Sequence, residues 1–156
     1  MFYLAKCLPS VWSSCFVRWL QLYPVNMKRI LSQFALLVRN YDEAIDYYCG
    51  CLGFSLVEDT DMGGGKRWVV VRPSEASGGA NILLAQAKNA EEQDAIGFQS
   101  GGRVFLFMET DDFWRDYKAY LAKGVDFTEE PRVEVYGTVV VFRDLYGNKW
   151  DLICRK

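Results

Sequence analysis

The sequence predicts an α+β domain built from two tandem βαβββ modules, because one order of patterns occurs twice along the chain. Each copy opens with a run of β-forming residues, at 33–38 and again at 103–108. Each run ends at Asn or Asp residues that favour the start of a helix. A repeat of this kind indicates a duplicated structural unit.

The expected helices follow these starts. The first should begin at Asn40, with Glu43 three residues later as in a capping box, and the second at Asp111 or Asp112. Each helix is expected to end at a glycine that leads into a short strand. Apolar residues recur at helical spacing in both segments: Ala44, Ile45, Tyr48 and Leu52, then Phe113, Tyr117, Tyr120 and Leu121.

Each module should close with a β-hairpin, formed by residues 68–71 with 81–84 and by 138–142 with 150–153. The modules then span about 28–87 and 102–155 and are joined by a polar linker, 88–101. Half-sheets of this size cannot bury both faces alone, so they are expected to associate edge to edge. The result would be a curved mixed sheet around a ligand-sized cleft, with the helices outside.

Residues 1–26 do not follow this pattern. They contain Lys6 and Arg18 but no acid, whereas all twenty acids lie in 27–156. Polar residues and Pro9 interrupt any signal-peptide or membrane-spanning stretch. We therefore expect an N-terminal extension before a single domain at 27–156, and no membrane partner.

Composition excludes several functions. The chain has no His, the usual ligand for zinc and iron and the usual base near neutral pH. A net charge of −2 without a concentrated basic face argues against nucleic acid as a partner. Five cysteines without a CxxC spacing indicate reduced thiols, and so a cytoplasmic protein.

Two segments resemble a known superfamily. FALLVRNYDEAIDYYCGCLGF is similar to the opening module, and VYGTVVVFRDLYGNKWDLICRK to the closing hairpin, of the vicinal oxygen chelate (VOC) superfamily. This superfamily contains glyoxalase I, bleomycin-resistance proteins and extradiol dioxygenases, and the chain looks closest to its uncharacterised, glyoxalase-like bacterial members. The resemblance implies a small-molecule ligand, and a homodimer as the assembly.

The resemblance also implies where a metal would be bound, in the first and last strands of each module. Those positions fall on Gln33, Leu83, Arg103 and Asp151. Leu has no lone pair and Arg stays cationic, so neither can be a metal ligand. The usual metal is therefore not expected, and without His a 2-His-1-carboxylate iron site is excluded. An oxygen-only site for magnesium or manganese, formed by Gln33, Glu109 and Asp151, stays open.

The candidate ligand-binding residues are those expected to face the cleft. Arg103 would either bind an anionic ligand or pair with Asp151. Glu109 is the best candidate for a catalytic base, provided that burial raises its pKa. Glu129, Glu130 and Glu134 should lie in a solvated loop or on the rim of the cleft. The full predicted set is Gln33, Leu83, Arg103, Phe105, Phe107, Glu109 and Asp151.

Three functions follow, in order of preference. The first is a metal-independent protein that binds an aromatic or charged small molecule, without a cofactor. The second is a glyoxalase-like lyase or isomerase with an altered oxygen-ligand metal site, so the sequence leaves enzymatic activity open. The third is a partner-binding module whose cleft is closed by Arg103 and Asp151.

Overall fold

The protein is described by a computed structural model that covers residues 29–73 and 79–156. Contacts separate Ser32–Lys156, which contains both modules, from the residues that precede it. The predicted extension at 1–26 lies outside the described residues. No helix in the described ranges is long and apolar enough to cross a membrane.

The first module forms a mixed four-stranded sheet in the order β1-β4-β3-β2. Its strands are β1 (Gln33–Val38), β2 (Ser55–Asp61), β3 (Arg67–Arg72) and β4 (Asn81–Gln86). β1 pairs with β4 in parallel and the other pairs are antiparallel. The linker contains a short helix, α3 (Ala90–Ala95).

The second module repeats this order as β5-β9-β8-β6. A short strand that the sequence did not predict, β7, also pairs with β8, so the acidic segment expected as a loop is partly a strand. The helix α4 (Phe113–Ala122) starts at Asp112, whose side chain accepts a hydrogen bond from the backbone N–H of Arg115. The strands are β5 (Val104–Glu109), β6 (Asp126–Phe127), β7 (Arg132–Glu134), β8 (Gly137–Arg143) and β9 (Lys149–Arg155).

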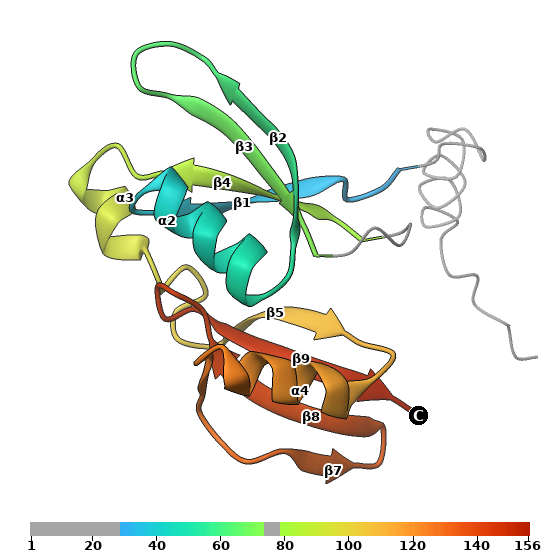
Figure 1. The fold of residues 1–156 in the computed structure, drawn as a ribbon. Helices are drawn as coiled ribbons and strands as arrows, with labels where there is room; N and C mark the ends of the chain where they lie inside the picture. Colours follow the sequence, from blue (N-terminus) through green and yellow to red (C-terminus); the bar gives the residue numbers. More distant parts are fainter. Residues whose placement is uncertain (1–28, 74–78) are drawn as a thin grey trace, which may run out of the picture. The chain divides into compact units, whose positions relative to one another are not determined.

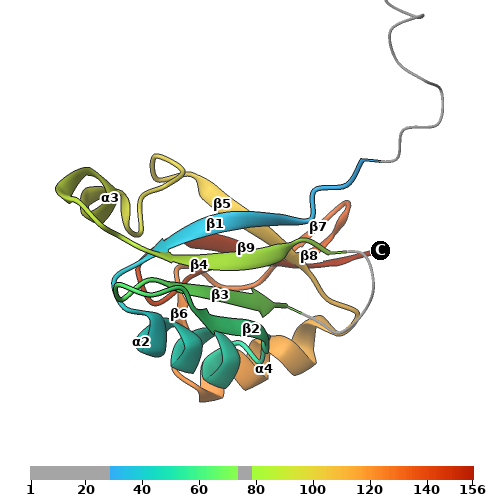
Figure 2. The ribbon, with the colours of Figure 1, turned by 90° about the horizontal axis from the view of Figure 1, so that it is seen from above.

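The predicted α+β class is confirmed, but side chains rather than a shared ladder join the modules in the described part of the chain. β1 and β5 are the edge strands of separate sheets. The ring of Phe34 in β1 meets that of Phe105 in β5 edge-on, and Gln99 of the linker accepts a hydrogen bond from the backbone N–H of Leu37 at 2.7 Å. α4 and the helical segment that begins with α2 (Tyr41–Ile45) lie on the same side of the two sheets (Figures 1 and 2).

The first helix begins as predicted and continues differently. Asn40 accepts hydrogen bonds from the backbone N–H groups of Asp42 and Glu43. The Glu43 carboxylate accepts from the Tyr146 hydroxyl at 2.8 Å instead of closing a capping box. After Ile45 the segment widens into a π-helix, η1 (Asp46–Cys51), which an apolar pattern of helical spacing does not reveal.

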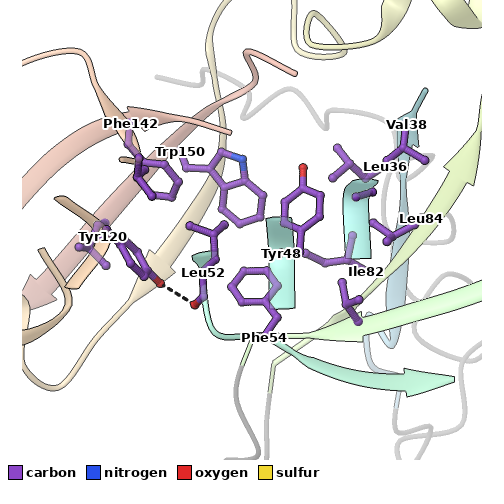
Figure 3. Packing of buried hydrophobic residues seen from close by; sticks show 14 of the residues in the cluster. Leu36, Val38, Tyr48, Leu52, Phe54, Ile82, Leu84, Tyr120, Phe142 and Trp150 are labelled. Carbon is purple, nitrogen blue, oxygen red and sulfur yellow. Dashed lines mark hydrogen bonds between the residues drawn. The ribbon is translucent and has the colours of Figure 1, made fainter. Parts of the chain in front are cut away.

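The core lies between the helices and the sheets, and its aromatic centre spans both modules. Trp150 is 2% exposed. Its ring lies 6.2 Å from that of Tyr48, 6.1 Å from that of Phe54 and 5.9 Å from that of Phe142, as ring centroids (Figure 3). Trp150 therefore faces the helix-covered side of its sheet, and its neighbour Asp151 faces the other.

A buried carboxylate ties this centre together. Asp144, in the turn between β8 and β9, is 5% exposed. It accepts hydrogen bonds from the Tyr48 hydroxyl at 2.7 Å and from Trp150 Nε1 at 3.0 Å. It also accepts from the backbone N–H groups of Tyr146 and Asn148. Burial, with Asp144 beside it, raises the pKa of Tyr48 well above its ordinary value, so Tyr48 stays a donor.

We expect Asp144→Ala to lower the free energy of unfolding by about 3 kcal/mol, because buried donors on both modules lose their acceptor. Urea denaturation measures the change. The control is Asp126→Ala, which removes an exposed ion pair with Arg143 and should change stability by at most about 0.5 kcal/mol. Equal effects of the two substitutions would contradict the proposed role of Asp144.

Candidate functional site

A pocket of about 560 Å³ opens on the face of the second sheet that bears Asp151. We call it the open-face pocket. Its lining includes Arg103, Phe107, Glu129, Val141, Arg143 and Asp151. In the sheet, Asp151 is in register with Phe107 on one side and Val141 on the other, so these three side chains are neighbours on one face.

Asp151 is the unusual residue of this pocket. Its Oδ1 atom is buried and has no hydrogen-bond partner among the described residues. Burial raises the pKa of the Asp151 carboxyl; nearby Arg132 lowers it, and Glu129 raises it further. A buried carboxylate oxygen without a donor is unfavourable, so the site favours a donor from outside the chain or a protonated carboxyl.

The predicted ion pair between Arg103 and Asp151 is not among those formed by the described residues. Arg103 precedes β5, and its backbone N–H donates to the carbonyl of Ser100. An irregularity between Val104 and Leu106 shifts the register with β9, so that Phe107 lies opposite Asp151. Arg103 still lines the open-face pocket.

Phe107 is an exposed aromatic residue in the middle of a strand. Its side chain is 66% exposed, although its neighbours Leu106 and Met108 pack against the core. An apolar ring that is left open beside a buried carboxylate provides a surface on which a planar ligand can stack.

Glu109 does not meet the condition set for a catalytic base. Its side chain is 60% exposed, and it accepts from Arg155 Nε at 2.5 Å in an ion pair. The cause is position, since Glu109 is the last residue of β5. Glu109 is therefore an exposed, ion-paired residue and not a carboxylate enclosed in a cleft.

The residues at the four positions where the resemblance implies metal ligands do not fit the metal site of the superfamily. Leu83 offers no lone pair and Arg103 is a cation. Gln33 lies on the first sheet, whereas Glu109 and Asp151 lie on the second. Across the ranges that the structure covers, no three Asp, Glu, Cys or His side chains are close enough to hold a metal ion.

The seven predicted site residues are thus not gathered in one place. Arg103, Phe107 and Asp151 share the open-face pocket. Gln33 and Leu83 lie on β1 and β4 of the first sheet, and Phe105 packs against Phe34 between the modules.

Sequence reasoning missed part of the pocket wall. Alternation along β8 could have identified Val141, which pairs with Asp151. Glu129, expected in a solvated loop or on the rim of the cleft, also lines the pocket. Its carboxylate accepts from the backbone N–H of Val141 at 3.2 Å, and this contact holds Thr128 and Glu129 beside the pocket.

The raised pKa of Asp151 leads to a prediction about pH. A carboxyl whose pKa is higher in the folded state destabilises the fold once it ionises. Stability should therefore fall as the pH rises through that pKa. Asp151→Asn should stabilise the protein near pH 7, and the difference should vanish below about pH 4, where the carboxyl is protonated in both states. Urea denaturation from pH 3.5 to 8 measures this; a variant less stable at neutral pH would contradict it.

The chain is similar in sequence and in fold to known proteins. A profile described as the Glyoxalase/Bleomycin resistance protein/Dioxygenase superfamily matches residues 30–152. A protein of Shewanella frigidimarina (strain NCIMB 400), described only as uncharacterized, is 53% identical over 128 residues, which cover 81% of this chain and 94% of that one.

Two crystal structures share the fold. UcmS2 matches with a TM-score of 0.70 and 25% identity, over 81% of this chain and 98% of its own. TnmS3, an antibiotic binding protein from Streptomyces sp. CB03234, matches with a TM-score of 0.66 and 24% identity, over 83% and 98%. With the paired βαβββ modules and the profile match over most of its length, this chain belongs to the glyoxalase/bleomycin resistance protein/dioxygenase superfamily.

Proposed function

We propose that this protein binds a small molecule in the open-face pocket, without the metal of its metal-dependent relatives. The observation that carries the proposal is the buried, unpartnered Oδ1 of Asp151 beside the exposed ring of Phe107. A ligand with an N–H or O–H donor would bind the Asp151 carboxylate where it lines the pocket, and a planar ligand would cover the ring.

The charges around the pocket narrow the ligand class. Arg143 pairs with Asp126, and Lys149 donates to the carbonyl of Gly102. No ion pair within the described residues uses Arg103, which leaves its guanidinium available to an acidic group. We infer a planar compound with a donor for Asp151 and an acidic substituent for Arg103.

The alternative functions have less support. A closed, partner-binding cleft required an Arg103–Asp151 pair, whereas the pocket beside these residues is open. A lyase or isomerase required a buried base, and Glu109 is exposed and paired with Arg155. The antibiotic-binding description of TnmS3 adds an example of small-molecule binding on the same fold. The homodimer and the cytoplasmic location remain predictions.

Thermal unfolding with a panel of aromatic amines, aromatic acids and compounds with both groups tests the proposal. At a hundredfold excess over its Kd, a ligand should stabilise the fold by about 2.7 kcal/mol. Phe107→Ala and Asp151→Ala should abolish the shift. Trp114→Ala, which removes a 52% exposed aromatic side chain on α4, should leave it unchanged. A panel without any stabilising compound would count against small-molecule binding.

A second test concerns metal. We expect substoichiometric metal by plasma mass spectrometry on protein purified without chelator, and again after dialysis against magnesium, manganese, zinc and nickel, because Leu83 and Arg103 replace ligands. Near-stoichiometric metal that is lost in Asp151→Ala would overturn the metal-free proposal and favour the lyase or isomerase.

A further inference from the structure

A second pocket, of about 650 Å³, opens between the two modules. We call it the seam pocket. It lies between strands of the first sheet and the edge of the second, which form separate hydrogen-bonded sheets. Its apolar lining comes from both modules: Phe34, Ile82, Leu106, Met108 and Trp150.

The seam pocket is distinct from the open-face pocket. Ile82 and Trp150 belong to the core on the helix-covered side, and Phe34, Leu106 and Met108 pack against that core. Trp150 and Asp151 are adjacent in β9 and point to opposite faces of the sheet. The two pockets share Phe107, which lies on the edge strand β5.

The lining requires an apolar ligand body. The edge-on contact of Phe34 with Phe105, with centroids 6.3 Å apart, brings the two modules together beside the pocket. Water beside these apolar side chains finds few hydrogen-bond partners, whereas a ring or branched chain restores dispersion contacts with them. Met108 adds a side chain that adapts to the shape of a ligand. The volume is in the range of small-molecule sites.

The mouth of the pocket carries positive charge. Arg72 lines the pocket and is half-buried, and its Nε donates to Asn81 Oδ1 at 3.0 Å, which orients the guanidinium. Glu109 also lines the pocket, but Arg155 neutralises it through an ion pair. Among the described residues, Arg72 and the Glu109–Arg155 pair together carry a net charge of about +1, which favours an anion.

We infer that the seam pocket is a separate binding site for an amphipathic aromatic anion, such as an aromatic carboxylate or sulfonate. The ring occupies the apolar lining and the acidic group meets Arg72. This site does not depend on the proposed function, because it uses neither Asp151 nor Arg103.

Fluorescence titration with 1-anilinonaphthalene-8-sulfonate tests the inference, because this probe combines an aromatic body with a sulfonate. We expect saturable binding at one site per chain. Arg72→Gln should weaken binding roughly tenfold, through loss of the charged contact. N-phenyl-1-naphthylamine, which lacks the sulfonate, should bind Arg72→Gln as well as it binds the original protein.

Matched variants locate the probe. Leu106→Trp should fill the pocket and abolish binding of both probes. Leu121→Trp, at a 55% exposed position on α4, should leave the binding of both probes unchanged. Near-ultraviolet circular dichroism checks that each variant is folded. If Leu106→Trp does not fold, Arg72→Gln alone tests the inference.

Unchanged affinity in Arg72→Gln would overturn the inference. If Asp151→Ala abolished binding of the probe and Arg72→Gln did not change it, the inference would also be overturned. That result would place the probe in the open-face pocket. That outcome would leave the proposed function standing.

Discussion

The arrangement of this protein depends on one buried carboxylate, that of Asp144. It accepts hydrogen bonds from Tyr48 in the first module and from Trp150 in the second, and also from the backbone of its own turn. No cation pairs with it in the described residues, so these donors replace the water that it loses. Because Trp150 is held on the helix-covered side, the next residue, Asp151, must face the opposite side of the sheet. The buried Asp144 thereby helps to determine on which face of the sheet Asp151 lies.

The second constraint is that β1 and β5 are sheet edges that do not pair with each other. Side chains rather than backbone hydrogen bonds join the modules there, which leaves room for a hollow between them. Alternation along β5 then gives the strand two roles. Leu106 and Met108 line the apolar seam pocket, and Phe107 extends to the open-face pocket beside Asp151. Two surfaces of different chemistry thus lie on either side of one short strand.

We propose that Asp151 binds a small molecule on a fold that, by the resemblance to metal-dependent members of the superfamily, can hold a metal. Leu83 and Arg103, at two of the four positions where the resemblance implies metal ligands, cannot coordinate an ion. The Oδ1 atom of Asp151 is nevertheless buried and without a donor. Such an oxygen is better suited to hydrogen bonding with a ligand than to contributing stability, which agrees with the rise in its pKa.

The sequence by itself determined the duplicated module and the two helix starts, at Asn40 and at Asp111 or Asp112, between which the structure chose Asp112. These features depend on local preferences. Only the tertiary structure decided the register shift that puts Phe107 opposite Asp151, the exposure of Glu109, and the position of Glu129 beside Val141. It also decided the separation of the two sheets, from which the seam pocket follows. Strand register and side-chain burial depend on contacts between segments that are distant in the sequence, so the local pattern of residues does not predict them.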